Sequence, residues 1–204
     1  MLRRLDTAGI ENVIALRGDP PRGSDRFVPV EDGFAHSTDL IRYIRANYDL
    51  GIAAACYPET HPEAVSPESD LEFARMKVDL GAEFLVSQLF FENRDFFGFV
   101  DRARRAGIEV PIIAGIMPIL SAAQIRRMTA LCGAGIPPAL DAKLSRHEGD
   151  DDAVRELGIE HATRQVRELW DNGVNGIHFY ALNRARSVSR VLRDLRLPGH
   201  EGDG

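Results

Sequence analysis

Five short apolar runs, each followed by a segment with helical spacing, constrain this chain more than any other feature of its sequence. The runs lie at residues 12–16, 52–57, 84–91, 111–118 and 176–183. Strands that alternate with helices pair in parallel through right-handed crossovers. Runs that are apolar throughout indicate strands covered on both faces. The pattern therefore predicts an α/β fold with a parallel sheet.

Segments with helical spacing follow each of these runs, and one short segment precedes the first run. The expected helices lie at residues 2–8, 37–44, 67–80, 94–105, 122–131, 152–172 and 187–195. Ser66 and Pro67 together predict a capped helix start with proline at its first position. The interval between the fourth and fifth runs is much longer than the others, so we expect an extra helical insertion before the last strand.

The number of strands leaves two architectures open. A closed (β/α)8 barrel normally needs roughly 250 residues and eight strands, whereas this chain has 204 residues and five strand candidates. It is either an open five-stranded sheet, similar in strand count to flavodoxin, or a barrel without its first three units. In both cases the carboxyl ends of the strands form the ligand-binding edge.

Composition excludes several classes of function. Hydrophobic residues make up 44% and charged residues 27% of the chain, which is ordinary for a soluble domain with a core. The net charge of −6 gives no field that would hold nucleic acid or an anionic membrane. Cys56 and Cys132 form neither a disulfide framework nor a zinc motif. We expect reduced thiols in a cytoplasmic protein, and no metal site.

Polar residues at the strand ends are the candidate ligand contacts. Neither a Rossmann glycine motif nor a phosphate-binding loop is present. Arg17-Gly18-Asp19 ends the first run, where glycine permits close backbone approach and a carboxylate can tune a cofactor. Residues 57–64 form a stiff loop that presents Tyr57 and His61. Taken alone, each segment is equally compatible with an ordinary solvated turn.

Six segments in order resemble the methylenetetrahydrofolate reductases over nearly the whole chain. They are Ile14–Pro21, Tyr57–Ala64, Lys77–Ala82, Ser87–Phe91, Pro111–Pro118 and Phe179–Arg184. The resemblance implies a (β/α)8 TIM barrel, present here as strands 4–8 in residues 1–197, followed by a polar tail at 198–204. It also implies FAD as cofactor and a ping-pong reaction, in which NADH or NADPH reduces the flavin before methylenetetrahydrofolate enters. Members are often homo-oligomers.

The resemblance assigns roles residue by residue. Asp19 matches the catalytic position that tunes the flavin and contacts folate. The positions that match cofactor contacts are Arg17, Gly18, Asp19, Ser37, Tyr57, His61, Ala64, Asp70 and Lys77. The positions that match substrate contacts are Gln88, Gln124 and Arg184. Gln88 also stands inside an apolar run, where its amide needs a backbone or ligand partner.

Two departures from the family pattern accompany this resemblance. Phe73 and Met76 stand where better-known bacterial members carry polar or basic residues on the cofactor helix. The family's first strand carries a glutamate that acts as general acid, and no segment of this chain matches it. We expect a truncated sequence, and a non-catalytic flavin- or folate-binding module derived from this family is the alternative.

Overall fold

The computed structural model describes residues 1–18, 27–31 and 33–195, and within them helices and strands alternate as the sequence predicts. The strands are β1 (Asn12–Ala15), β2 (Gly51–Cys56), β3 (Phe84–Ser87), β4 (Ile112–Ile116) and β5 (Ile177–Phe179). The helices are α1 (Leu2–Thr7), α2 (Ser37–Asn47), α3 (Pro67–Asp79), α4 (Asn93–Arg105), α5 (Ala122–Cys132), α6 (Pro138–Arg146), α7 (Asp151–Asp171) and α8 (Ala185–Leu195). The predicted insertion before the last strand is α6 together with α7. The polar tail at 198–204 lies outside the described residues.

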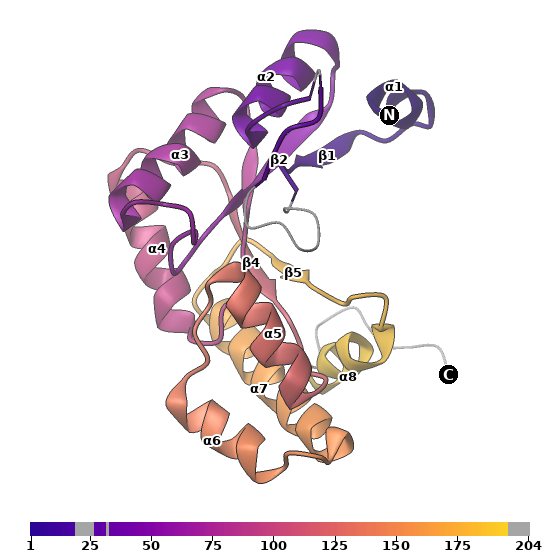
Figure 1. Cartoon of the computed structure of the whole chain (residues 1–204), viewed down its shortest axis with the longest axis vertical. Helices are drawn as coiled ribbons and strands as arrows, with labels where there is room; N and C mark the ends of the chain where they lie inside the picture. The colour runs from indigo at the N-terminus through magenta and orange to yellow at the C-terminus, as the bar shows by residue number, and fades with distance from the viewer. Residues whose placement is uncertain (19–26, 32, 196–204) are drawn as a thin grey trace.

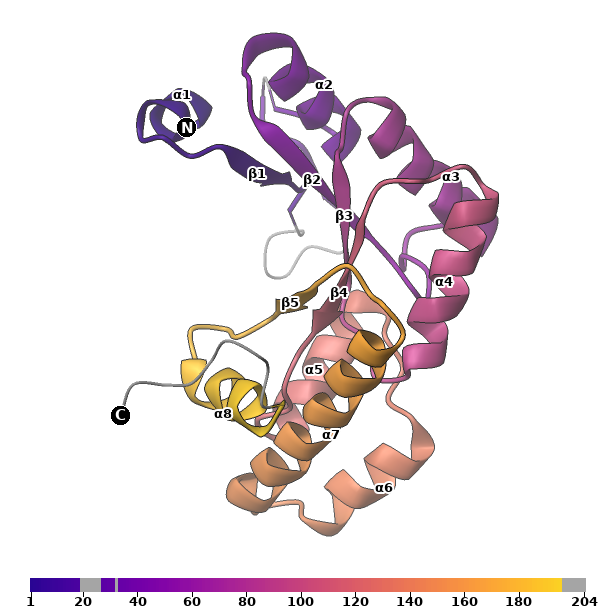
Figure 2. The same ribbon diagram turned by 180° about the vertical axis from the view of Figure 1, so that it is seen from behind.

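The five strands form one parallel sheet in which each strand lies beside the next one along the chain. The order is β1-β2-β3-β4-β5, and the register pairs Val13 with Ile52 and Leu85 with Ile112. A flavodoxin-like sheet would change direction at a switch point, so the flavodoxin strand order is excluded, although the sheet has five strands and is open in the described residues. The sheet curves with helices along its outside, which gives an incomplete, barrel-like arrangement (Figures 1 and 2).

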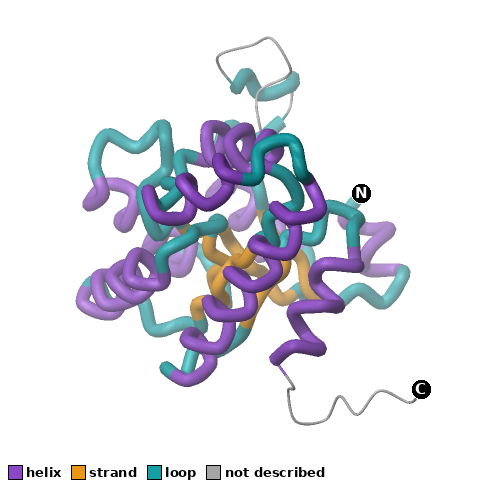
Figure 3. The backbone as a smooth tube through the Cα atoms, turned by 90° about the horizontal axis from the view of Figure 1, so that it is seen from below, coloured by secondary structure: helices purple, strands orange, loops and turns teal. Residues whose placement is uncertain are grey.

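The main core lies between the sheet and its outer helices. Alternate residues of β2 and β4 face it, as Ile52 and Ile116 illustrate, and they pack with Ile41 of α2 and Phe96 of α4. Burying one such side chain contributes about 1.5–3 kcal/mol. Figure 3 shows the strands at the centre of the molecule with helices around them. This layer fixes the strand ends from which the site loops emerge.

A second apolar cluster lies beyond the carboxyl ends of the strands. It joins Leu89 and Ile119, which follow β3 and β4, to Ile125 of α5 and Leu144 of α6. The insertion therefore covers this end of the sheet. Gly158 lets α7 approach closely, because a Cβ there would lie 2.3 Å from the carbonyl oxygen of Ile119.

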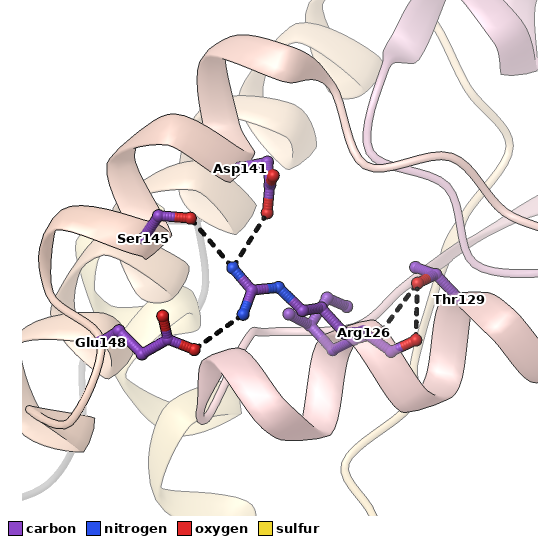
Figure 4. A network of polar contacts seen from close by, with 6 residues as sticks. Arg126, Thr129, Asp141, Ser145 and Glu148 are labelled. Atoms are coloured by element: carbon purple, nitrogen blue, oxygen red, sulfur yellow. Dashed lines mark hydrogen bonds and ion pairs between the residues drawn. The ribbon is translucent and has the colours of Figure 1, made fainter.

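Arg126 on α5 holds the insertion in place through polar contacts (Figure 4). Its guanidinium donates to Glu148 at 2.8 Å, to Ser145 Oγ at 2.9 Å and to Asp141 at 3.4 Å. One arginine thus connects α5 to α6 and to the turn that follows it. Because all the charged groups are well exposed to solvent, the network orients these elements more than it stabilises them.

A buried amide network joins α4 to α7. The side-chain amide of Asn93 donates to the carbonyl oxygen of Gln165 at 3.0 Å and to Glu168 at 2.7 Å. Gln165 donates in return to the carbonyl oxygen of Phe90 at 3.2 Å. Since buried amides without partners are costly, this network fixes one way of docking α7 against the turn after β3.

The two outer edges of the sheet lead to a prediction about association. In the described part of the chain no strand pairs with the outer edge of β1 or β5, and Ile14 of β1 is 45% exposed. Unpaired strand edges form templates for other chains. We therefore expect the 204-residue chain to self-associate, and Ile14→Lys to shift it toward monomer.

Light scattering coupled to gel filtration over a range of concentrations measures this directly. Val65→Lys is the matched control, because Val65 is exposed in a loop and lies on no strand. A wild-type chain that elutes as a sharp monomer at every concentration would contradict the prediction.

Candidate functional site

The loop at residues 57–64 follows β2 and is held from β1 and α3 on one side. Arg17, just beyond β1, donates to both carboxylate oxygens of Glu63, at 2.7 and 2.9 Å. On the side of α3, Asp70 accepts the backbone N–H of His61 at 3.0 Å. The Arg17 guanidinium lowers the pKa of Glu63, so the pair is ionic.

The same loop is held from α4 and from the segment after α5. Arg102 donates to the carbonyl oxygen of Pro58 at 3.2 Å. Gly135 N–H donates to Glu59 at 2.8 Å. Thr60 has a φ of 97°, a left-handed conformation that non-glycine residues rarely adopt. Elements from four parts of the chain therefore fix a strained loop, and such strain is common at ligand-binding sites.

Tyr57 and His61 form the aromatic part of this loop, as predicted. Their rings pack edge to face with centroids 4.6 Å apart. Nδ1 of His61 accepts the backbone N–H of Glu63 at 3.0 Å, so the proton of the neutral ring is on Nε2. Burial lowers the pKa of His61. The loop therefore presents a phenol and a neutral imidazole that can donate from Nε2, and half-buried Ala64 closes it through its N–H to His61 O at 2.9 Å.

Lys77 and Asp70 both lie on α3, beside the end of β2. The ammonium of Lys77 donates to the carbonyl oxygen of Ala55 at 2.8 Å. Burial lowers the pKa of Lys77, and the neighbouring Cys56 and Asp70 oppose this shift. Burial likewise raises the pKa of Asp70 and raises that of the Cys56 thiol to about 12. Both positions, which match cofactor contacts of the family, therefore lie beside the end of β2.

The end of β1 carries the predicted Arg-Gly-Asp segment. Gly18 has a φ of 90°, and a Cβ there would meet no atom within 4 Å. Arg17 lies 4.8 Å from the centre of the Phe27 ring and, with that ring, lines a cavity of about 280 Å³. Asp19, the predicted catalytic position, lies outside the described residues.

The remaining predicted residues lie on other elements. Ser37 is the first residue of α2, and His36 is the N-cap, with its N–H bonded to Asp39 at 3.0 Å. The placement of Gln88 within a strand is wrong, because β3 ends at Ser87. Arg184 is exposed in the turn before α8.

Gln88 and Gln124 are oriented in the same way. The side-chain oxygen of Gln88 accepts the N–H of Leu89 at 2.9 Å, and that of Gln124 accepts the N–H of Leu120 at 3.1 Å. An amide whose oxygen is bonded this way still has its NH₂ group to donate. Each glutamine can therefore donate a hydrogen bond from its NH₂ group to an acceptor atom of a ligand.

Sequence reasoning missed a group of residues that shape this edge. Ser87 is fully buried, its hydroxyl accepts Gly115 N–H at 2.8 Å, and its carbonyl oxygen accepts Tyr180 OH at 2.9 Å. Burial raises the pKa of Tyr180 to about 12.

Glu59 and Glu63 were inside a matched segment, but no local pattern indicated their partners. Phe73 and Met76, the departures on α3, are 47% and 44% exposed.

The described ranges 1–18, 27–31 and 33–195 form neither a metal-binding cluster nor a membrane-spanning helix. No group of three or more His, Cys, Asp or Glu side chains there could hold a metal ion. None of the described helices is both long and apolar enough to cross a membrane.

Comparisons with known proteins place the chain in a family. A model of the methylenetetrahydrofolate reductase family matches residues 1–196. The chain is 41% identical to methylenetetrahydrofolate reductase (NADH) 1 of Zea mays over 207 residues, covering 96% of this chain and 35% of that protein. It is 39% identical to a probable methylenetetrahydrofolate reductase (NADPH) of Caenorhabditis elegans, covering 99% and 30% respectively. The chain thus spans about a third of the length of these relatives.

A solved structure supports the fold independently. It is an uncharacterized protein from Clostridium thermocellum that binds two copies of 5-methyl-5,6,7,8-tetrahydrofolic acid. The TM-score is 0.57 at 19% identity, over 85% of this chain and 63% of that one. Taken with the family match over residues 1–196, the ordered motifs show that this chain belongs to the methylenetetrahydrofolate reductase family.

Proposed function

We propose that this chain contributes to the catalytic domain of an enzyme that reduces 5,10-methylenetetrahydrofolate to 5-methyltetrahydrofolate with NADH or NADPH. The observation that carries the proposal is the 57–64 loop. It lies at the carboxyl end of β2, and contacts from four parts of the chain hold it. Parallel α/β folds bind ligands at this edge. We assign β1–β5 to strands 4–8 of the family barrel.

The residues around the loop fit FAD as the cofactor. The ammonium of Lys77 can offset the charge of its diphosphate, Arg17 beside Glu63 can donate along the flavin, and His61 offers a neutral donor. Gly18, with open space around it, lets the backbone approach a flat ring. Bound at this loop, FAD would supply the hydride chemistry that links the nicotinamide to the folate.

Residues on the neighbouring strands are proposed to bind the substrates. Gln88 and Gln124 each retain an amide NH₂ that can donate to a pterin or nicotinamide acceptor. Arg184 is exposed and can pair with the glutamate tail of folate. Asp19 is proposed to tune the flavin, because a nearby negative charge disfavours an anionic reduced ring. The two glutamines and Arg184 would therefore orient a substrate, and Asp19 would disfavour negative charge on the reduced flavin.

The first experiment is a visible absorption spectrum of the purified chain after it is mixed with FAD and freed of excess. We expect a retained flavin band, which is lost in His61→Ala and kept in the control His147→Ala, an exposed position at the end of α6. A colourless wild-type protein would contradict flavin binding by this chain.

Turnover separates the enzyme from the alternative. Oxidation of NADH or NADPH, followed by formation of 5-methyltetrahydrofolate, would support the reductase. Because no segment of this chain matches the general-acid glutamate, turnover by the isolated chain would rule out the non-catalytic binding module. An upstream reading frame without a Glu-Phe-Phe segment would instead count against the reductase.

A further inference from the structure

Glu59 of the 57–64 loop forms a side-chain hydrogen bond with the segment after α5. It is half-buried, and its Oε2 accepts the backbone N–H of Gly135 at 2.8 Å. Its Oε1 is buried and has no hydrogen-bond partner among the described residues. An incompletely satisfied buried carboxylate carries a free-energy cost, so its position calls for an explanation other than stability.

Two glycines let the segment after α5 approach this loop. Gly133 ends α5 with a φ of 74°, and a Cβ there would lie 2.9 Å from Cγ of Pro62. At Gly135 a Cβ would lie 3.0 Å from the bonded oxygen of Glu59. The end of α5 and the loop therefore touch at two points, of which the Glu59 bond is the polar one.

We propose that Glu59 is a positioning residue that couples the 57–64 loop to the end of α5. The loop carries the proposed flavin contacts Tyr57 and His61, and α5 carries the proposed folate contact Gln124. Through the Gly135 bond, Glu59 holds the two halves of the site in a fixed relation. The inference rests on the proposed function for its ligands, but the coupling itself is a property of the chain.

The surroundings of Glu59 indicate which substitutions keep the coupling. Burial raises the pKa of the Glu59 carboxyl, the hydrogen bond from Gly135 N–H lowers it, and the charge of Asp95 on α4 raises it further. Burial also raises the pKa of Cys132 at the end of α5, and the charge of Glu59 adds to that increase. The Gly135 bond needs only an acceptor oxygen. Glutamine keeps that oxygen, whereas alanine removes it. Glu59→Gln should therefore preserve what Glu59→Ala loses.

The test compares Glu59→Ala, Glu59→Gln and the control Glu109→Ala, an exposed position before β4. Amide hydrogen exchange is measured at Gly135, at Gly133, which caps α5, and at His61 in the loop. We expect Glu59→Ala to accelerate exchange about tenfold at all three, and the other two variants to match the wild type. An acceleration confined to Gly135 would overturn the coupling, as would a Glu59→Gln variant that behaves like alanine.

FAD affinity, followed by flavin fluorescence, is the second readout. We expect Kd to rise about tenfold in Glu59→Ala and to return to the wild-type value in Glu59→Gln. Unchanged Kd in Glu59→Ala would also overturn the inference. If the wild-type chain binds no FAD, the proposed function fails, and the exchange pattern then decides the coupling by itself.

Discussion

Replacing Gly115 with alanine is expected to lower the free energy of unfolding by about 3 kcal/mol or more, as overpacking of a tightly packed site does. A Cβ on Gly115 would lie 2.2 Å from the carbonyl oxygen of Ser87 and 2.8 Å from Cε2 of Tyr180. The Ser87 oxygen belongs to the backbone of β3 and also accepts the Tyr180 hydroxyl. Relieving this overlap requires β3 and β4 to separate, which would also break the hydrogen bond between Gly115 N–H and the Ser87 hydroxyl.

Urea denaturation followed by circular dichroism measures this change. Gly98→Ala is the matched control, because Gly98 lies inside α4 and a Cβ there meets only Nη1 of Arg102, at 3.5 Å. Alanine inside a helix is favoured over glycine by roughly 0.5–1 kcal/mol, so this variant should be slightly more stable. A Gly115→Ala chain as stable as Gly98→Ala would show that the two strands are not in tight contact.

The stability of the chain is expected to fall by about 3 kcal/mol between pH 6.5 and about pH 4 because of His161 alone. Burial, with help from Arg164, lowers the pKa of His161 from 6.5 to about 4. The unfolded chain thus binds a proton in this window that the folded chain does not, and stability decreases as pH falls. Each pH unit in the window corresponds to about 1.4 kcal/mol.

The neutral form of His161 fits its surroundings. Nε2 lies 3.1 Å from the carbonyl oxygen of Phe91, to which it donates, and Nδ1 lies 3.3 Å from a guanidinium nitrogen of Arg164. His161→Gln can keep the donor to Phe91 without titrating. We expect its unfolding free energy, measured in urea at several pH values, to depend less steeply on pH than that of the wild type.

His147→Gln, at the exposed end of α6, controls for the loss of an imidazole from the unfolded chain. Parallel pH profiles for the wild type and His161→Gln would contradict the role assigned to His161. A profile that flattens equally in His147→Gln would do so as well.

Local sequence patterns located the five strands and every described helix except α6, but not all of their ends. Apolar runs located the five strands because helices cover the outside of the sheet. The expectation that both faces are covered is wrong for β1 and β5, in which Ile14 and His178 are exposed. The same rule extended β3 too far, since Leu89 and Phe91 pack in the second cluster and Phe90 packs in the main core, all three outside the strand. It also extended β5, where the chain turns through Leu182 and Asn183 with φ of 47° and 60°. Apolarity indicates burial, whichever element provides it.

The candidate site also contains some residues that the sequence could predict and others that it could not. Tyr57 and His61 were predictable because they lie within one short loop and their rings meet there. The partners of the loop carboxylates were not, because Arg17 and Glu63 are 46 residues apart and Glu59 and Gly135 are 76 apart. No helical or strand period relates such positions. Only the folded sheet, with its loops gathered at one edge, brings them together.

The sequential strand order also has a consequence for synthesis of the protein. Because each strand pairs with the one before it, β1, β2 and β3 can assemble while the rest of the chain is still on the ribosome. The bonds that tie Asn93 to Gln165 and Ser87 to Tyr180 span 72 and 93 residues, so they close only after α7 and β5 emerge. Until then the growing chain exposes the edge of its newest strand, which makes the nascent protein a natural client for chaperones that shield such edges.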